Sequence, residues 1–231
     1  MKIPRILNFI FTNLFLLLFC VANAQETETI QQKEKVSNQN GLSFGLDLAP
    51  FIIMGFDSDR KGVDFVTRYM FKKKWFVIGE VGFENVKFEE DLYDYRSNGG
   101  FLKLGIDYNF FKVDEPGNND NITFGLRYGI GTQSHESPRF SIWDDYWGDY
   151  TGKFDLSNVT SHWVELVGGI RTEVLKNFYM GWTIRMKTLV AVGNTNELNP
   201  YTIPGYGRGD NSVNLGFTYT LEYYIPFRSR K

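Results

Sequence analysis

The residues of this chain best suited to catalysis are two Ser–His pairs. They contain its two histidines, and each pair has a glutamate close behind it: Ser134–His135 with Glu136, and Ser161–His162 with Glu165. A serine hydroxyl, an imidazole base and a carboxylate that orients the base would together make a hydrolytic nucleophile. Adjacent residues of a strand point to opposite faces, so such a site would need the serine of one pair and the histidine of the other. No nucleophile elbow or metalloprotease motif accompanies them. The simpler interpretation is that both pairs are ordinary polar residues at the rim of the β-barrel that is predicted below.

A second candidate site is the stretch SIWDDYWGDYTGKFD, in which aromatic and acidic residues alternate. The aromatic residues that could contact a partner there are Trp143, Tyr146, Trp147 and Tyr150. Aromatic platforms bind sugars and proteins, and clustered carboxylates can hold calcium, but the spacing does not match an EF-hand loop. Packing of these rings on one another or on the rest of the fold is the alternative.

Composition excludes several functions. The formal net charge of -2 provides no basic field for nucleic acid. The single cysteine, Cys20, lies in the leader described next, and with so few histidines we expect no zinc site, no other metal and no cofactor. Aromatic residues make up 17% of the chain, and many of its 23 glycines lie in alternating segments. That combination favours a β-rich surface facing lipid.

The first segment is typical of an export signal. Lys2 and Arg5 precede the apolar run ILNFIFTNLFLLLFCV, which ends in an Ala-Asn-Ala cleavage site. The next segment, QETETIQQKEKVSNQN, is too polar to bury a core. The expected organisation is a cleaved signal peptide (1–24), a polar periplasmic tail (25–40) and an outer-membrane β-barrel (41–231).

The remainder alternates with a period of two residues. In NSVNLGFTYTLEYYIPF, residues 211–227, apolar and aromatic side chains fall on one face and polar or small ones on the other, which indicates a strand rather than a helix. The segments with this pattern predict eight strands: 42–54, 63–71, 75–88, 101–111, 121–131, 163–175, 177–193 and 211–227.

Strand length and connection length both favour a transmembrane barrel over a soluble one. The predicted strands are long enough to cross a bilayer at a tilt. Connections alternate between tight ones (72–74, 113–121, 176–177) and long ones (55–62, 89–99, 134–161, 194–212). Bacterial outer-membrane barrels have short periplasmic turns and long extracellular loops. A lipocalin-like barrel would need its aromatic residues inside, where eight strands leave too little room. We therefore predict an all-β, eight-stranded, antiparallel, up-and-down transmembrane β-barrel in the cell outer membrane.

With the apolar face outward, the lumen receives charges of both signs. The predicted lumen charge network is Asp47, Asp64, Arg68, Glu80, Glu84, Lys103, Asp107, Arg127, Glu165, Arg171, Glu173, Arg185, Lys187 and Glu222. Charges in a narrow, poorly solvated space must pair with one another, so the prediction is a salt-bridged, closed lumen rather than an open pore.

Several blocks resemble a known family: DLYDYRSNGGFLKLGIDYNFF, ITFGLRYGIGTQSH, SHWVELVGGIRTEVLKNFYMGWTIRMKTLV, IPGYGR and GFTYTLEYYIPF. They are similar to small Bacteroidota outer-membrane proteins known only as domain of unknown function 6048. The resemblance covers most of the segment after the leader. It implies an eight-stranded barrel, and it implies no activity, cofactor or catalytic residue.

Two classes of function remain. The first is a structural or interaction role, with the aromatic extracellular loops presented to another outer-membrane protein or a surface lipoprotein, and outer-membrane lipid as the surrounding partner. The alternative is a lipid-modifying enzyme at the rim, or a small gated pore. A closed lumen and the large aromatic loop favour the first class.

Overall fold

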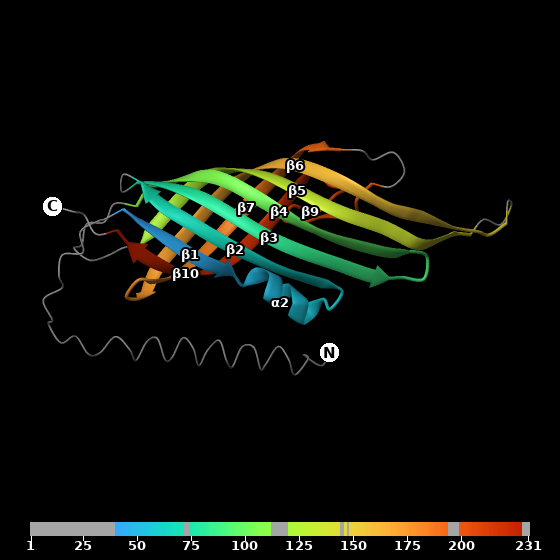
Figure 1. The fold of residues 1–231 in the computed structure, drawn as a ribbon, viewed down its shortest axis with the longest axis horizontal. Helices are drawn as coiled ribbons and strands as arrows, with labels where there is room; N and C mark the ends of the chain where they lie inside the picture. Colours follow the sequence, from blue (N-terminus) through green and yellow to red (C-terminus); the bar gives the residue numbers. More distant parts are fainter. Residues whose placement is uncertain are drawn as a thin grey trace, which may run out of the picture. The chain divides into compact units, whose positions relative to one another are not determined.

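The computed structural model describes residues 40–71, 74–111, 120–143, 146, 148–193 and 199–227. In this part of the chain eight long strands close into an antiparallel barrel in the order β1-β10-β7-β6-β5-β4-β3-β2 (Figure 1). The strands are β1 (Gly41–Asp47), β2 (Arg60–Phe71), β3 (Trp75–Glu89), β4 (Asp94–Asn109), β5 (Asn121–Ile142), β6 (Tyr150–Leu175), β7 (Phe178–Val192) and β10 (Val213–Pro226). Helix α2 (Ala49–Phe56) connects β1 to β2, and a short hairpin of β8 (Thr202–Ile203) and β9 (Gly207–Arg208) lies between β7 and β10.

The two faces of the barrel wall differ as the alternation predicts. On β5 the outward residues Ile122, Phe124, Leu126, Tyr128 and Ile130 are exposed. The residues between them are buried in the lumen: Thr123 and Gly125 come before Arg127, and Gly129 and Gly131 come after it. The other strands add exposed aromatic and aliphatic side chains to the same outer belt, among them Phe65, Phe83, Leu104 and Trp182. A continuous apolar belt around a polar interior is the construction of a transmembrane β-barrel, and this confirms the predicted fold class.

No helix in the described part of the chain is both long and apolar enough to cross a membrane. The predicted signal peptide lies outside the described residues, as does the polar tail apart from Asn40.

The barrel has two different ends. One end, here called the turn end, carries the β2–β3 and β6–β7 turns; the β6–β7 turn is tight because Asn177 adopts a positive φ of 64°. The opposite end, here called the loop end, carries α2, the β5–β6 hairpin tip and the β8–β9 hairpin. Both candidate sites from the sequence lie toward the loop end.

One predicted strand, 42–54, is wrong from residue 48 onward. β1 stops at Asp47, whose Oδ1 accepts hydrogen bonds from the amides of Ala49 (2.9 Å) and Tyr219 (3.0 Å). Pro50 follows, and a proline has no amide proton for a strand ladder but is well suited to the first turn of a helix. The chain therefore continues as α2, whose apolar residues imitate the composition of a buried strand.

Two predicted long loops are also largely wrong. Most of the predicted loop 134–161 belongs to β5 and β6, and residues 94–99 of the predicted loop 89–99 belong to β4. The inward residues still alternate in this region, but the outward ones turn polar, as at Thr132, Ser134 and Glu136. The strands continue past the apolar belt, and the hydrophobic period disappears because the outer face leaves the lipid-facing zone.

Candidate functional site: the lumen and the loop end

Glu80 is the centre of the first group of charges in the lumen. Its carboxylate accepts hydrogen bonds from the Arg185 guanidinium at 2.6 and 2.9 Å and from Arg127 Nε at 3.3 Å. Lys103 Nζ lies 3.7 Å from the same carboxylate and 3.1 Å from Glu165, which Arg185 also contacts at 3.1 Å. All five side chains are at least nine-tenths buried. Each charge has an opposite charge beside it, as a buried ion must have to be tolerated.

A second group, toward the turn end, joins the first through Arg127. Arg127 forms a bidentate pair with Asp107, and Asp107 also accepts from Arg68 Nη1 at 2.9 Å. Arg68 Nε then lies 3.4 Å from Glu222, which Arg171 Nε approaches at 3.0 Å. The ion pairs are therefore continuous from Arg171 to Lys103. Bidentate and shared ion pairs of this kind hold buried charges in fixed positions.

The other predicted lumen residues have separate contacts. Glu84 pairs with Arg60 at 3.0 Å, and Glu173 accepts a hydrogen bond from the Asn177 amide at 2.7 Å. Lys187 Nζ donates to the Gly205 carbonyl at 2.8 Å. Asp47 is held by backbone amides, and Asp64 lines a cavity described below. Among the described residues, the structure thus brings nine of the fourteen predicted charges into one network.

The β8–β9 hairpin covers the lumen at the loop end. Ile203 and Tyr206 of this segment are buried and pack with Phe101 and Trp163 of the barrel wall. Gln133 Nε2 donates to the Thr202 carbonyl at 2.8 Å, so the hairpin is also tied by hydrogen bonds. From its sequence this segment is expected to be part of the long extracellular loop 194–212, and the one local signal for its turn is the Pro-Gly dipeptide in IPGYGR.

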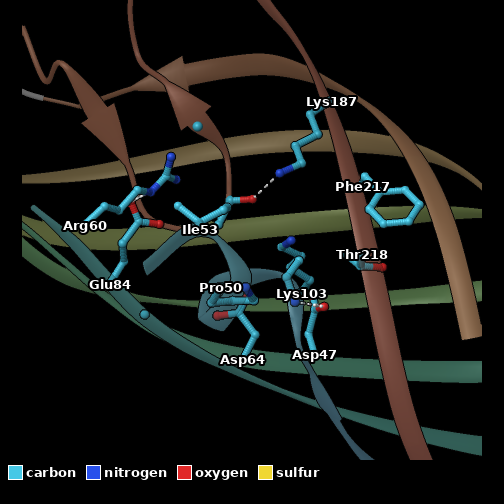
Figure 2. Close-up of a pocket in the computed structure, with 14 residues that line it drawn as sticks. Asp47, Pro50, Ile53, Arg60, Asp64, Glu84, Lys103, Lys187, Phe217 and Thr218 are labelled. Atoms are coloured by element: carbon cyan, nitrogen blue, oxygen red, sulfur yellow. Dashed lines mark hydrogen bonds and ion pairs between the residues drawn. The ribbon is translucent and has the colours of Figure 1, made fainter. Parts of the chain in front are cut away.

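A cavity of about 100 Å³ lies beside this hairpin (Figure 2). Its lining comes from α2, from the strands β1, β2, β3, β4, β7 and β10, and from the hairpin segment, and it includes Pro50, Ile53, Asp64, Lys187, Phe217 and Gly205. Figure 2 shows the Lys187 ammonium reaching the hairpin carbonyl, with Asp64 next to Pro50. Sequence reasoning missed this cavity because it depends on α2, which was predicted to be a strand.

The two Ser–His pairs do not assemble a catalytic group. His135 and Ser161 both face the lumen, but His135 is level with Ser157 and Ser161 with Gly131, an offset of about 13 Å along the strand. Ser134 and His162 face outward and have other partners: Ser134 donates to Asn158 at 2.6 Å, and His162 Nδ1 lies 2.8 Å from the Tyr128 hydroxyl.

The two glutamates are engaged elsewhere. Glu136 lies 3.8 Å from Arg96, and Glu165 belongs to the lumen network and accepts from Trp163 Nε1 at 2.7 Å. The hypothetical serine, histidine and carboxylate are therefore never in mutual contact in this structure.

His135 has an unusual position nonetheless. Its side chain is fully buried, and neither ring nitrogen has a hydrogen-bond partner among the described residues. It lies beyond the apolar belt, with its ring 6.2 Å from that of Tyr95. Burial lowers the pKa of the His135 imidazole, because no nearby carboxylate compensates the loss of water around the charged ring.

The predicted partner loop lies at the tip of the β5–β6 hairpin. Trp143, Tyr146 and Tyr150 are 74%, 84% and 60% exposed, whereas Trp147 lies outside the described residues. Phe140 stacks on Phe154 with a centroid separation of 4.8 Å, just below the tip. Within the described residues, no group of three or more His, Cys, Asp or Glu side chains is arranged to hold a metal.

Solved structures of similar fold include three bacterial proteins. Ail, the attachment invasion locus protein of Yersinia pestis, is 13% identical, and the match covers 80% of this chain and 97% of Ail with a TM-score of 0.40. The N-terminal β-barrel domain of Pseudomonas aeruginosa OprF is 9% identical, and the match covers 81% of this chain and 98% of that domain with a TM-score of 0.39. Neisserial surface protein A is 11% identical, and the match covers 83% of this chain and 98% of that protein with a TM-score of 0.39. Identities and scores this low carry no information about function. No curated protein sequence matches the chain.

The sequence itself gives a more specific match. A family profile described as a domain of unknown function, DUF6048, matches residues 6–230. This range contains all of the barrel, including the hairpin that covers the lumen and the strands that carry the ion network. The chain therefore belongs to the DUF6048 family.

Proposed function

We propose that this protein is an outer-membrane barrel with a closed lumen that presents its β5–β6 hairpin to a partner protein or lipoprotein at the cell surface. The apolar belt supports insertion in a bilayer. The fully paired ion network and the covering hairpin support a lumen that does not conduct, since a pore would have to break several buried ion pairs.

The observation that carries the interaction role is the length of the β5–β6 hairpin. β6 pairs with β7 only from Ser161 onward, so residues 150–159 extend beyond β7 and pair with β5 alone in the described structure. The projecting hairpin exposes Trp143, Tyr146, Tyr150 and Leu156. Exposed aromatic and aliphatic side chains on a rigid, projecting element are typical of protein contact sites.

The experiment is affinity purification from the native outer membrane in mild detergent, followed by mass spectrometry. Replacing Trp143, Tyr146 and Tyr150 together by serine should remove a stoichiometric partner. Leu92→Ser, at another exposed apolar position of the loop end, is the matched control and should retain the partner. Purification without a partner, or an equal yield of partner with the triple variant, would contradict the proposal.

A rim enzyme and a gated pore have less support. The serine and histidine side chains that an enzyme would need lie apart or have other partners, as described above. A pore would need a path through the Glu80 and Glu222 clusters, where each carboxylate is held by at least two cations.

A further inference from the structure

The barrel wall is interrupted at the loop end, next to β1. β1 pairs with β2 only as far as Asp64 and with β10 only as far as Thr220. Beyond these positions, residues 60–63 of β2 and 213–218 of β10 have no barrel strand between them in the described structure. Helix α2 follows β1 at this place and comes close to both strands (Figure 1). A helix cannot continue a strand ladder, so no ladder of backbone hydrogen bonds closes the wall here in the described structure.

The cavity of Figure 2 lies at this interruption. It is lined on one side by Pro50 and Ile53 of α2, and on the other by Phe217 and Thr218 of β10. Thr218 belongs to the lumen face of β10, whereas Phe217 belongs to the outer face and is 51% exposed. The cavity therefore borders residues of both faces of β10.

The outer side of the cavity is at the level of the apolar belt. Leu215 and Val213 extend the exposed apolar face of β10 from Phe217 further toward the loop end. The outer face of α2 is apolar and exposed as well, through Phe51, Ile52 and Phe56. In a membrane these residues would contact acyl chains, so the cavity opens sideways toward lipid.

Two ionisable groups on the polar side of the cavity, one acidic and one basic, form no ion pair among the described residues. Most of its charged residues have partners: Arg60 pairs with Glu84, Lys103 with Glu80 and Glu165. Among the described residues, Asp64 forms no ion pair or hydrogen bond, and the one hydrogen bond of Lys187 goes to the neutral Gly205 carbonyl. An ammonium and a carboxylate that both face a small cavity suit a ligand that carries the opposite pair of charges.

We propose that this cavity binds the headgroup of a zwitterionic membrane lipid of the phosphoethanolamine type, which enters sideways between α2 and β10. The lipid ammonium would meet Asp64 and the phosphate would meet Lys187, while the acyl chains lie against Phe217 and the outer face of α2. A volume of about 100 Å³ suits a headgroup and excludes the chains. The inference rests on the insertion of the barrel in a bilayer, as proposed above, but not on any partner of the β5–β6 hairpin.

The test is native mass spectrometry of the purified full barrel in detergent, with phosphatidylethanolamine, phosphatidylglycerol or phosphatidylcholine added. Heat-modifiable migration on gels and insertion into vesicles are measured first, so that failure of the membrane proposal is seen separately from failure of lipid binding. We expect phosphatidylethanolamine to be retained preferentially, because phosphatidylglycerol has no ammonium and the choline group has no N–H donor.

Variants locate the site. Asp64→Asn and Lys187→Gln should each lower phosphatidylethanolamine retention about tenfold, the usual effect of losing one charge-assisted hydrogen bond. Lys187→Arg should restore retention, and Lys61→Gln, which removes an exposed charge on the outer side of β2, is the matched control. Equal retention of the three lipids, or undiminished binding by folded Asp64→Asn and Lys187→Gln, would overturn the proposal. Binding of soluble phosphoethanolamine as tightly as the lipid would also overturn it, in favour of a soluble zwitterion.

Discussion

Replacing Glu80 should destabilise the barrel more than replacing any single cation that contacts it. The main network contains five cations (Arg68, Lys103, Arg127, Arg171 and Arg185) and four carboxylates (Glu80, Asp107, Glu165 and Glu222) among the described residues. Glu80→Gln keeps the volume of the side chain but removes a carboxylate that Lys103, Arg127 and Arg185 share, so the excess of cations in the buried network rises from one to two. Breaking a buried pair by removing one partner costs about 3–5 kcal/mol, and Glu80→Gln should fall in this range.

Arg185→Met should cost less. After that change Glu80 still has Arg127 and Lys103, and Glu165 still has Lys103 and the Trp163 indole. No carboxylate is left alone, so we expect a loss of about 1–3 kcal/mol, comparable to leaving a few hydrogen-bonding groups unpaired. The double variant restores the original excess of one cation and should cost less than the sum of the two single changes.

The assay is equilibrium unfolding in urea of barrels refolded in lipid vesicles, followed by tryptophan fluorescence and by heat-modifiable migration on gels. Arg208→Gln is the control, because Arg208 pairs with Asp210 in a solvent-exposed site; such pairs contribute little to stability. The reasoning is refuted if Glu80→Gln is no more destabilising than Arg185→Met, or if the two changes are strictly additive. Either result would mean that Glu80 is not the shared counter-charge of this cluster.

Three further outcomes are expected. Burial lowers the folded-state pKa of His135, so the native state binds fewer protons than the unfolded state. The stability of the loop end should therefore be complete above about pH 6.5, the pKa of an unperturbed histidine, and should decline as the pH falls below that value. His135→Gln should remove this decline in a proteolysis assay of the β8–β9 hairpin, with the outward-facing His162→Gln as control. Gly205→Ala should loosen the same hairpin by at least about 1 kcal/mol, since Gly205 has a φ of +74° and an added Cβ would lie 2.6 Å from the Phe101 ring; an unchanged urea midpoint would contradict this. Pro50→Ser should weaken α2 only slightly, whereas Asp47→Ala should release both Ala49 and Tyr219 amides and lower the urea midpoint clearly.

The barrel itself could be predicted from the sequence because every outward side chain of the apolar belt faces the same lipid-like environment. From Ile122 to Ile130 every second side chain is apolar, and the structure places all of these outside. The period is lost where the environment changes, so the outer parts of β5 and β6 were mistaken for a loop. α2 was missed because an apolar segment of this length has the composition of a strand, and Pro50 was the one residue arguing otherwise.

The sequence could predict which charged residues face the lumen, but not which of them pair with one another. Alternation identified which charges face inward, yet register alone does not determine their partners. Arg127 is level with Glu165 on the neighbouring strand, but its guanidinium pairs with Asp107 and Glu80 instead. Such choices depend on side chains reaching across the lumen, and on the depth of the β8–β9 hairpin, which no local pattern specifies.

A membrane-inserted barrel whose lumen is closed by its own charges should not conduct ions. The most direct test is conductance of the purified protein in planar bilayers, after insertion has been verified by protease protection and heat-modifiable migration. We expect no stable current through the wild-type barrel and none after deletion of residues 201–208, because the ion network lies below the hairpin. A steady, salt-dependent current from the inserted wild-type protein would contradict it.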